Sequence, residues 1–150
     1  MTQNLANFLT GATAKAFAIR TGTAAHAALQ RVVLDSGQTC GDQELIGIIK
    51  NRLDLAKFFV ASAKTEVPIA GVIHGHFISR RIDRMLINHD TKTIDFVDYK
   101  TDTDKTVFVK KYHEQLSEYA ELLSSAYPGF KINGYILWLH DWNLELSVKM

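Results

Sequence analysis

The chain has 150 residues, a net charge of +1 and 47% hydrophobic residues, which indicates one globular domain with a sizeable core. Its 2 Pro and 9 Gly exclude a disordered or collagen-like chain. No apolar run approaches the roughly 20 residues that a membrane-spanning helix requires, and the N-terminus lacks the basic-then-apolar order of a secretory signal. We therefore expect a cytoplasmic protein without a membrane partner.

The first part of the chain, residues 1 to about 64, is predicted to be helical. Apolar residues recur at helical spacing from about residue 4 to 33, with a break at Gly22, and a second apolar stripe runs from about residue 43 to 63. The segment 35–41 (DSGQTCG) between the two stripes is predicted to be a loop, because its residues favour turns.

The second part, residues from about 65 to 150, is predicted to form an α/β layer. Three β-rich runs lie within residues 67–100 and are separated by short turns, as in an antiparallel meander. A helix is expected over about 107–126, followed by two strands in 131–140 and 143–149. Because no internal repeat or linker interrupts this order, residues 1–150 are expected to form a single domain.

Cysteine content and charge restrict the site chemistry and the partners. Cys40 is the only cysteine, so neither an internal disulfide nor a four-cysteine zinc or iron–sulfur site can form. A free-standing nucleic-acid binder is usually more basic than this chain, since phosphate neutralisation supplies most of its non-specific affinity. Either the chain binds no nucleic acid, or another protein or domain brings the nucleic acid to it.

A candidate site lies on the second and third predicted strands. Side chains alternate along a strand, so Asp98 and Lys100 point to one face, and Asp83 lies on the neighbouring strand. If the two strands pair through the NHDTK turn, the two carboxylates share a site that suits Mg²⁺ or Mn²⁺. Such an ion polarises a phosphodiester and lowers the pKa of a bound water. Lys100 would orient that water or stabilise the charge that develops on the phosphorus centre.

Taken alone, this pattern is weak evidence for catalysis. An Asp-x-Lys sequence at a strand end is more often a solvated edge of a sheet. Asp83 and Arg84 are equally compatible with a surface ion pair of little energetic consequence. The spacing therefore permits a catalytic site without requiring one.

Four motifs in a fixed order make the pattern more specific. They are Gly22-Thr23-Ala24-Ala25-His26, then RRIDRML (80–86), then Asp98-Tyr99-Lys100-Thr101, and then Gln115-Leu116-Ser117-Glu118-Tyr119. Together they resemble the RecB-like nuclease family, whose pattern is roughly G-T-x-x-H, G-x-x-D-R, D-Y-K-T and Q-L-x-x-Y. The resemblance is greatest to the AddA-type branch, the C-terminal nuclease domains of the helicase–nuclease subunit of AddAB. One departure is Arg80, which stands where the family usually has Gly; it is expected to alter strand geometry or to add a phosphate contact.

The resemblance implies a fold, a reaction and a set of metal ligands. The fold is a PD-(D/E)xK restriction-endonuclease-like core, in which helices flank a central mixed β-sheet. The metal ligands are His26, Asp83, Asp98 and the backbone carbonyl of Tyr99, and Lys100 takes the position of the catalytic lysine. The implied cofactor is Mg²⁺ or Mn²⁺. The related branch that carries an iron–sulfur cluster is excluded, because it needs four cysteines.

Other residues are expected to contact DNA or to support the site. Gln115 and Tyr119 match the Q-x-x-x-Y motif and lie four residues apart, hence on one helical face. The candidates for a surface that tracks phosphates are Arg80, Arg81 and Arg84 with Lys110 and Lys111, although a solvated face explains them equally well. Glu66, just before the first strand, is a weaker match to an acidic position of the family.

The resemblance predicts a metal-dependent deoxyribonuclease of the exonuclease type, the nuclease module of a helicase–nuclease in double-strand-break repair and recombination. Its substrate would be single-stranded DNA or a duplex end. Its partner would be a helicase motor, in the same chain or in another, because the sequence has no G-x-x-x-x-G-K-[ST] motif of its own. Two alternatives stay open: a catalytically silent DNA-binding or scaffold domain of the same fold, and a hydrolase of small phosphate esters.

Overall fold

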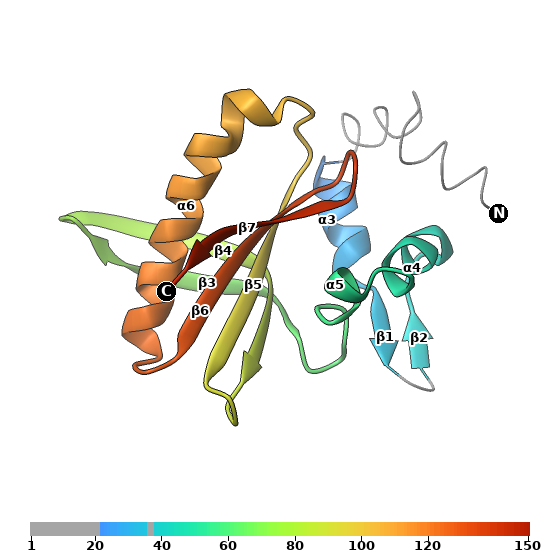
Figure 1. Ribbon diagram of the computed structural model, residues 1–150, viewed down its shortest axis with the longest axis horizontal. Helices are drawn as coiled ribbons and strands as arrows, with labels where there is room; N and C mark the ends of the chain where they lie inside the picture. Colours follow the sequence, from blue (N-terminus) through green and yellow to red (C-terminus); the bar gives the residue numbers. More distant parts are fainter. Residues whose placement is uncertain (1–21, 36–37) are drawn as a thin grey trace.

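A five-stranded mixed sheet organises the computed structural model, which describes residues 22–35 and 38–150 (Figure 1). Its strands, in spatial order, are β3 (Lys64–Ile73), β4 (His76–Asn88), β5 (Thr93–Lys100), β6 (Lys131–Trp138) and β7 (Asn143–Lys149). Neighbouring strands are antiparallel except for β5 and β6, which are parallel. The expected α/β class and the antiparallel meander are therefore confirmed.

The long helix α6 (Lys105–Ala126) covers one face of this sheet (Figure 1). A parallel pair of strands needs a crossover, and α6 supplies it between β5 and β6. The helix begins at Asp104, whose side chain accepts hydrogen bonds from the backbone N–H groups of Thr106 and Val107. It can approach β3 closely at Gly71, where a Cβ atom would lie 2.5 Å from Leu122 Cδ2.

Short elements cover the opposite face. They are the helices α3 (Gly22–Gln30), α4 (Gln43–Lys50) and α5 (Leu53–Ala56), and the hairpin of β1 (Val33–Asp35) and β2 (Gln38–Cys40). The expectation of a loop over 35–41 is thus wrong in part. The N–H group of Leu34 donates to the carbonyl of Phe59 at 2.7 Å, which anchors the hairpin beside the core.

The single helix expected over residues 43–63 is also wrong. The chain leaves the helix at Asn51, whose side-chain amide donates to the carbonyl of Gly47 at 2.9 Å, and Arg52 has an extended backbone. A side chain that bonds to the preceding turn competes with continued helix. Most of the helix expected from residue 4 lies outside the described residues. None of the helices that the structure describes is long and apolar enough to cross a membrane.

Strand β5 lies between two hydrophobic clusters, one on each face of the sheet. Ile94 and Phe96 pack with α6, whereas Val97 and Tyr99 pack with the short elements on the other face. Because β5 is central and covered on both faces, its side chains alternate between the two clusters and most of them are buried. The carboxyl end of this strand is where the candidate site lies.

Candidate active site

Asp83 lies at an interruption in the sheet. The β3–β4 pairs on either side of it are Thr65↔Arg84 and Val67↔Ile82. The rung between them holds Glu66 and Asp83, and Glu66 has a φ of 50°, in the left-handed region that side-chain-bearing residues rarely adopt. The β4–β5 ladder ends next to this rung, at Arg84↔Val97. At this rung β4 therefore loses regular pairing on both sides.

The interruption changes which face the neighbouring side chains occupy. Strict alternation would place Ile82 and Arg84 on one face, yet Ile82 packs in the cluster under α6 and Arg84 packs against Phe59 on the other side. Asp83, between them, turns its carboxylate toward β5, where Oδ2 accepts a hydrogen bond of 2.7 Å from the backbone N–H of Tyr99. The Asp83 carboxylate thus accepts the hydrogen bond that a backbone carbonyl of β4 would accept in a regular ladder.

Asp98 and Lys100 share the α6 side of β5, as alternation predicted. Lys100 Nζ lies 2.7 Å from Asp98 Oδ2 and donates a hydrogen bond of 3.0 Å to Gln115 Oε1 on α6. Asp98 is only 5% exposed, and its Oδ2 is the atom that faces the ammonium. This buried carboxylate is therefore paired with the cation of Lys100.

The electrostatics of Asp98 follow from its position. Burial, and next the charge of Asp83, raise the pKa of the Asp98 carboxyl from 3.8 to about 6, while Lys100 acts in the opposite direction. The Asp83 carboxylate is therefore close enough to Asp98 to disfavour its charged form. Two carboxyl groups this close form an electrostatically unfavourable pair, which a bound cation would stabilise.

His26 reaches the same place from helix α3. Its Nε2 lies 3.4 Å from Asp83 Oδ2, and its ring meets the ring of Tyr99 edge-on with 5.4 Å between centroids. The structure thus brings His26, Asp83, Asp98 and Lys100 together from helix α3 and strands β4 and β5. These residues span much of the chain in sequence, so tertiary packing alone joins them.

Arg84 is the residue that ties α3 to the sheet. It is 1% exposed, and its guanidinium donates to the carbonyls of Leu29 (2.8 Å), Gln30 (3.1 Å) and Phe58 (3.1 Å), and to the hydroxyl of Tyr99 (3.1 Å). The last carbonyls of a helix lack internal partners, and a cation there is favoured by the helix dipole. The expectation that Arg84 lies on a phosphate-tracking surface is therefore wrong, since the change of face at Asp83 turns it inward.

The Q-x-x-x-Y motif supports the site from α6. Gln115 Nε2 donates to the Tyr119 hydroxyl at 2.8 Å, while Gln115 Oε1 holds Lys100. Tyr119 is buried, so it supports Gln115 rather than offering a surface to DNA. The sequence did not reveal one further contact: Lys100 Nζ lies 4.2 Å from the ring centroid of Tyr112, one turn of α6 before Gln115. The helical spacing of Tyr112 and Gln115 was the available signal.

Arg81 and Glu66 lie beside the interruption, on the face of the sheet away from α6. Arg81 Nη1 is 3.5 Å from Glu66 Oε2, and the Arg81 side chain is 68% exposed. A pair this exposed contributes little to stability. A role for Arg81 in contacting DNA stays a prediction.

The fit of a metal ion rests on the donors themselves. Within residues 22–35 and 38–150, no group of three or more His, Cys, Asp or Glu side chains is arranged around one point. Asp98 and Asp83, whose charges influence each other, nevertheless offer carboxylate oxygens, which Mg²⁺ and Mn²⁺ prefer. With His26 beside Asp83, the donor set combines two carboxylates and an imidazole. This chemistry fits a divalent cation.

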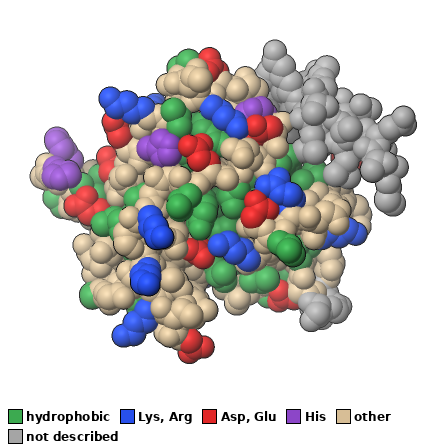
Figure 2. Space-filling model, viewed as in Figure 1, with side chains coloured by type: hydrophobic (Ala, Val, Ile, Leu, Met, Phe, Trp, Pro, Cys, Tyr) green, Lys and Arg blue, Asp and Glu red, His purple; other side chains and the backbone are tan. Residues whose placement is uncertain are grey.

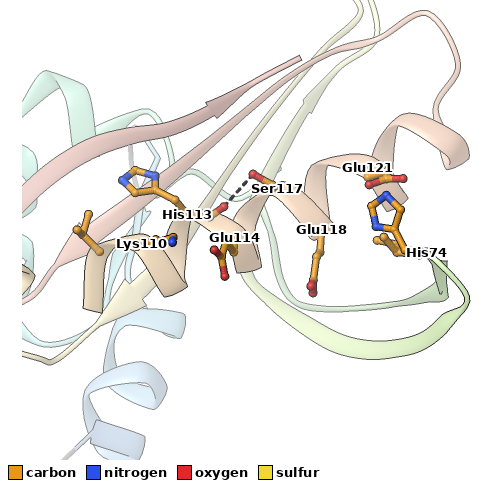
Figure 3. Close-up of a pocket in the computed structure, with 9 residues that line it drawn as sticks. His74, Lys110, His113, Glu114, Ser117, Glu118 and Glu121 are labelled. Atoms are coloured by element: carbon orange, nitrogen blue, oxygen red, sulfur yellow. Dashed lines mark hydrogen bonds between the residues drawn. The ribbon is translucent and has the colours of Figure 1, made fainter. Parts of the chain in front are cut away.

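Two of the grooves along α6 differ in size and in the residues that line them. The smaller, about 330 Å³, contains Lys100 and is lined by Arg80, Lys100, Lys111, Tyr112, Glu114, Gln115 and Glu118. The larger, about 750 Å³, lies between α6 and the turn joining β3 to β4 and is drawn in Figure 3, where His74 lies beside Glu121. None of the residues that line the larger groove belongs to the candidate site, so the smaller groove is the one that leads to it.

No protein-family model and no curated protein matches this chain. Its motifs, and the geometry of the side chains that they bring together, are therefore the features that bear on its function.

Proposed function

We propose that this chain is a metal-dependent DNA nuclease of the RecB-like, PD-(D/E)xK kind, with Asp83, Asp98 and Lys100 at its catalytic centre. The observation that carries the proposal is the convergence of these residues with His26. Asp98 and Lys100 share one face of β5. The Asp83 carboxylate accepts a hydrogen bond from the backbone N–H of Tyr99 and lies 3.4 Å from His26 Nε2. Surface carboxylates that serve only solubility have no reason to be assembled in this way.

The proposed roles follow from what each group can donate or accept. Asp83, Asp98, His26 and the Tyr99 carbonyl would hold Mg²⁺ or Mn²⁺, which when bound polarises a phosphodiester and lowers the pKa of water. Lys100 has three N–H donors: one meets Gln115, a second faces Asp98, and the third is available to a phosphate oxygen. A positioned ammonium there stabilises the negative charge that develops as the P–O bond breaks.

Gln115 and Tyr112 keep the Lys100 ammonium in place. The ammonium is held between the Gln115 amide oxygen and the face of the Tyr112 ring. Tyr119 in turn fixes the Gln115 amide, since it accepts from Nε2 and leaves Oε1 for Lys100. This chain of contacts favours one orientation of Lys100 before substrate arrives, which is what preorganised charge stabilisation requires.

A helicase motor is the proposed partner. The net charge is +1, and on the face shown in Figure 2 basic and acidic side chains are interspersed rather than gathered into one basic surface. Such a surface attracts DNA weakly at physiological salt. We therefore propose that the chain acts as the nuclease module of an AddA-type helicase–nuclease, whose motor delivers the strand. Cleavage by the isolated chain should then be slow and salt-sensitive.

The second candidate is a catalytically silent DNA-binding or scaffold domain of the same fold. It is favoured by the pairing of Asp98 with Lys100, whose ammonium lies 2.7 Å from Asp98 Oδ2 and already balances that carboxylate. The two candidates differ in metal binding. A nuclease binds Mn²⁺ through Asp98, so isothermal calorimetry with the wild type and Asp98→Asn separates them.

Cleavage of end-labelled single-stranded and duplex DNA with Mg²⁺, Mn²⁺ or EDTA tests the proposal. The wild type is compared with Lys100→Ala and with Lys131→Ala, an exposed lysine at the other end of the sheet. Metal-dependent cleavage that is lost in Lys100→Ala and kept in Lys131→Ala supports the proposal. Equal cleavage by all three proteins would place the activity elsewhere, and no cleavage with either metal would favour the silent domain.

A further inference from the structure

The smaller groove on α6 holds two cations besides Lys100. One is Arg80 on β4, three residues before Asp83, and the other is Lys111 on α6, one helical turn before Gln115. Arg80 comes from the sheet and Lys111 from the helix, so they reach the groove from its two walls. The groove therefore extends the positive charge of Lys100 along the surface between α6 and β4.

Neither cation is occupied by an acidic partner within the described residues. Arg80 Nη1 donates to the carbonyl of its neighbour Ser79 at 3.0 Å, and no ion pair of Arg80 or Lys111 is found among residues 22–35 and 38–150. Arg81, the next residue on β4, is paired with Glu66 on the other face of the sheet. Of the two adjacent arginines, Arg80 lines the groove and has no ion pair among the described residues, whereas Arg81 is paired with Glu66.

We propose that Arg80 and Lys111 form a second phosphate subsite, which binds the phosphate next to the one that is cleaved at Lys100. This inference rests on the proposed nuclease function and deepens it, because it makes the substrate a polynucleotide strand rather than a small phosphate ester. A guanidinium suits phosphate oxygens through its two parallel donors, and an ammonium on the facing wall completes the contact. Arg80 stands where the resembled family usually has Gly, so the subsite is a feature of this chain.

Two carboxylates limit where a DNA strand can lie in the groove. Glu114 and Glu118 line the same groove, so its residues carry three positive and two negative charges. A phosphate close to either glutamate would be repelled, so Arg80, Lys111 and Lys100 are the favourable contacts for a DNA strand in this groove. The groove is therefore suited to one strand held at adjacent phosphates, and not to the broad contact that a duplex backbone would need.

Binding of a fluorescein-labelled single-stranded oligonucleotide, measured by anisotropy in EDTA, tests the subsite without any cleavage. Arg80→Ala/Lys111→Ala is compared with Lys131→Ala/Lys149→Ala, which removes the same charge from exposed positions at the far end of the sheet. The groove variant should bind about tenfold more weakly, as expected for lost hydrogen bonds to charged groups. Its plot of log Kd against log salt should be shallower by about 1.4, from two lost contacts of about 0.7 each. Equal weakening in both double variants, or in neither, would overturn the proposal.

A kinetic comparison separates this inference from the proposed function. On bis(4-nitrophenyl) phosphate, which has a single phosphodiester, the groove variant should keep the kcat/KM of the wild type; on the oligonucleotide its KM should rise about tenfold with kcat unchanged. An equal loss on both substrates would overturn the subsite. If the wild type cleaves neither substrate, the nuclease proposal fails, while the anisotropy experiment still decides whether the groove binds phosphates.

Discussion

The Asp98 carboxylate should destabilise the metal-free fold, so Asp98→Asn should stabilise it. Asp98 is buried, and its pKa is raised from 3.8 to about 6, first by burial and next by Asp83. Asn has nearly the same shape and carries no charge. Removal of the charge therefore removes the cost of burying it beside Asp83.

The magnitude follows from the difference between the two pKa values of Asp98. The carboxyl titrates near 3.8 in the unfolded chain and near 6 in the folded protein, so the folded state holds the proton more tightly. The resulting cost is nearly absent at pH 4, grows as the pH rises between these values and is complete above pH 6. At about 1.4 kcal/mol for each pH unit, it reaches about 3 kcal/mol at pH 7.5.

Urea unfolding in EDTA, followed by the fluorescence of the buried Trp138 and Trp142, measures this difference. Asp98→Asn should be more stable than the wild type by about 3 kcal/mol at pH 7.5 and by less than about 1 kcal/mol at pH 4. Asp90→Asn, in the exposed β4–β5 turn, is the control and should show no such pH dependence. A less stable Asp98→Asn at pH 7.5, or a difference that is constant with pH, would refute the reasoning. Adding Mn²⁺ should stabilise the wild type and not the variant.

Three further predictions concern the groove and the helices that carry the site. Glu118→Gln should tighten oligonucleotide binding about threefold in low salt, since it removes one repulsive charge from the groove. Glu121→Gln, which lies outside that groove, is the control and should leave the affinity unchanged. Equal anisotropy curves for the two variants would contradict the prediction. Arg84→Met should lower the free energy of unfolding by about 3 kcal/mol in urea, because the carbonyls of Leu29 and Gln30 lose the hydrogen bonds from the guanidinium. A loss below about 1 kcal/mol would be the opposing result. Asp104→Ala should cost about 1 kcal/mol through the lost cap of α6, and an unchanged urea midpoint would disprove it.

Local periodicity predicted the parts of the site that lie within one element. Two-residue alternation placed Asp98 and Lys100 on one face of β5, and four-residue spacing placed Gln115 beside Tyr119; both contacts are present. The α/β class and the strand order of the meander were predictable for the same reason. These features depend on neighbours in sequence, and the patterns encode them directly.

What could not be predicted depends on an irregularity and on distant partners. The change of face at Asp83 breaks the alternation on which a strand reading relies, so Arg84 was misplaced on the surface. Its acceptors at Leu29 and Gln30 are more than 50 positions away in sequence. His26 was expected at the site through the family resemblance alone, since an Ala-rich helix gives no local sign of where its histidine will lie.

The buried guanidinium of Arg84 also determines how the site opens. Its acceptors come from α3, from the segment after α5 and from β5, so α3 cannot leave the sheet without breaking the bonds to Leu29 and Gln30 together and leaving buried polar groups unpaired. Detachment of α3 and withdrawal of His26 therefore form one cooperative opening event rather than gradual fraying. Amide exchange should report this unit as a block, in which the protected amides of α3 exchange at one common rate. In a chain whose sheet has formed while α3 is undocked, His26 would be absent from the proposed metal site, so the proposed nuclease activity would require that α3 docks first.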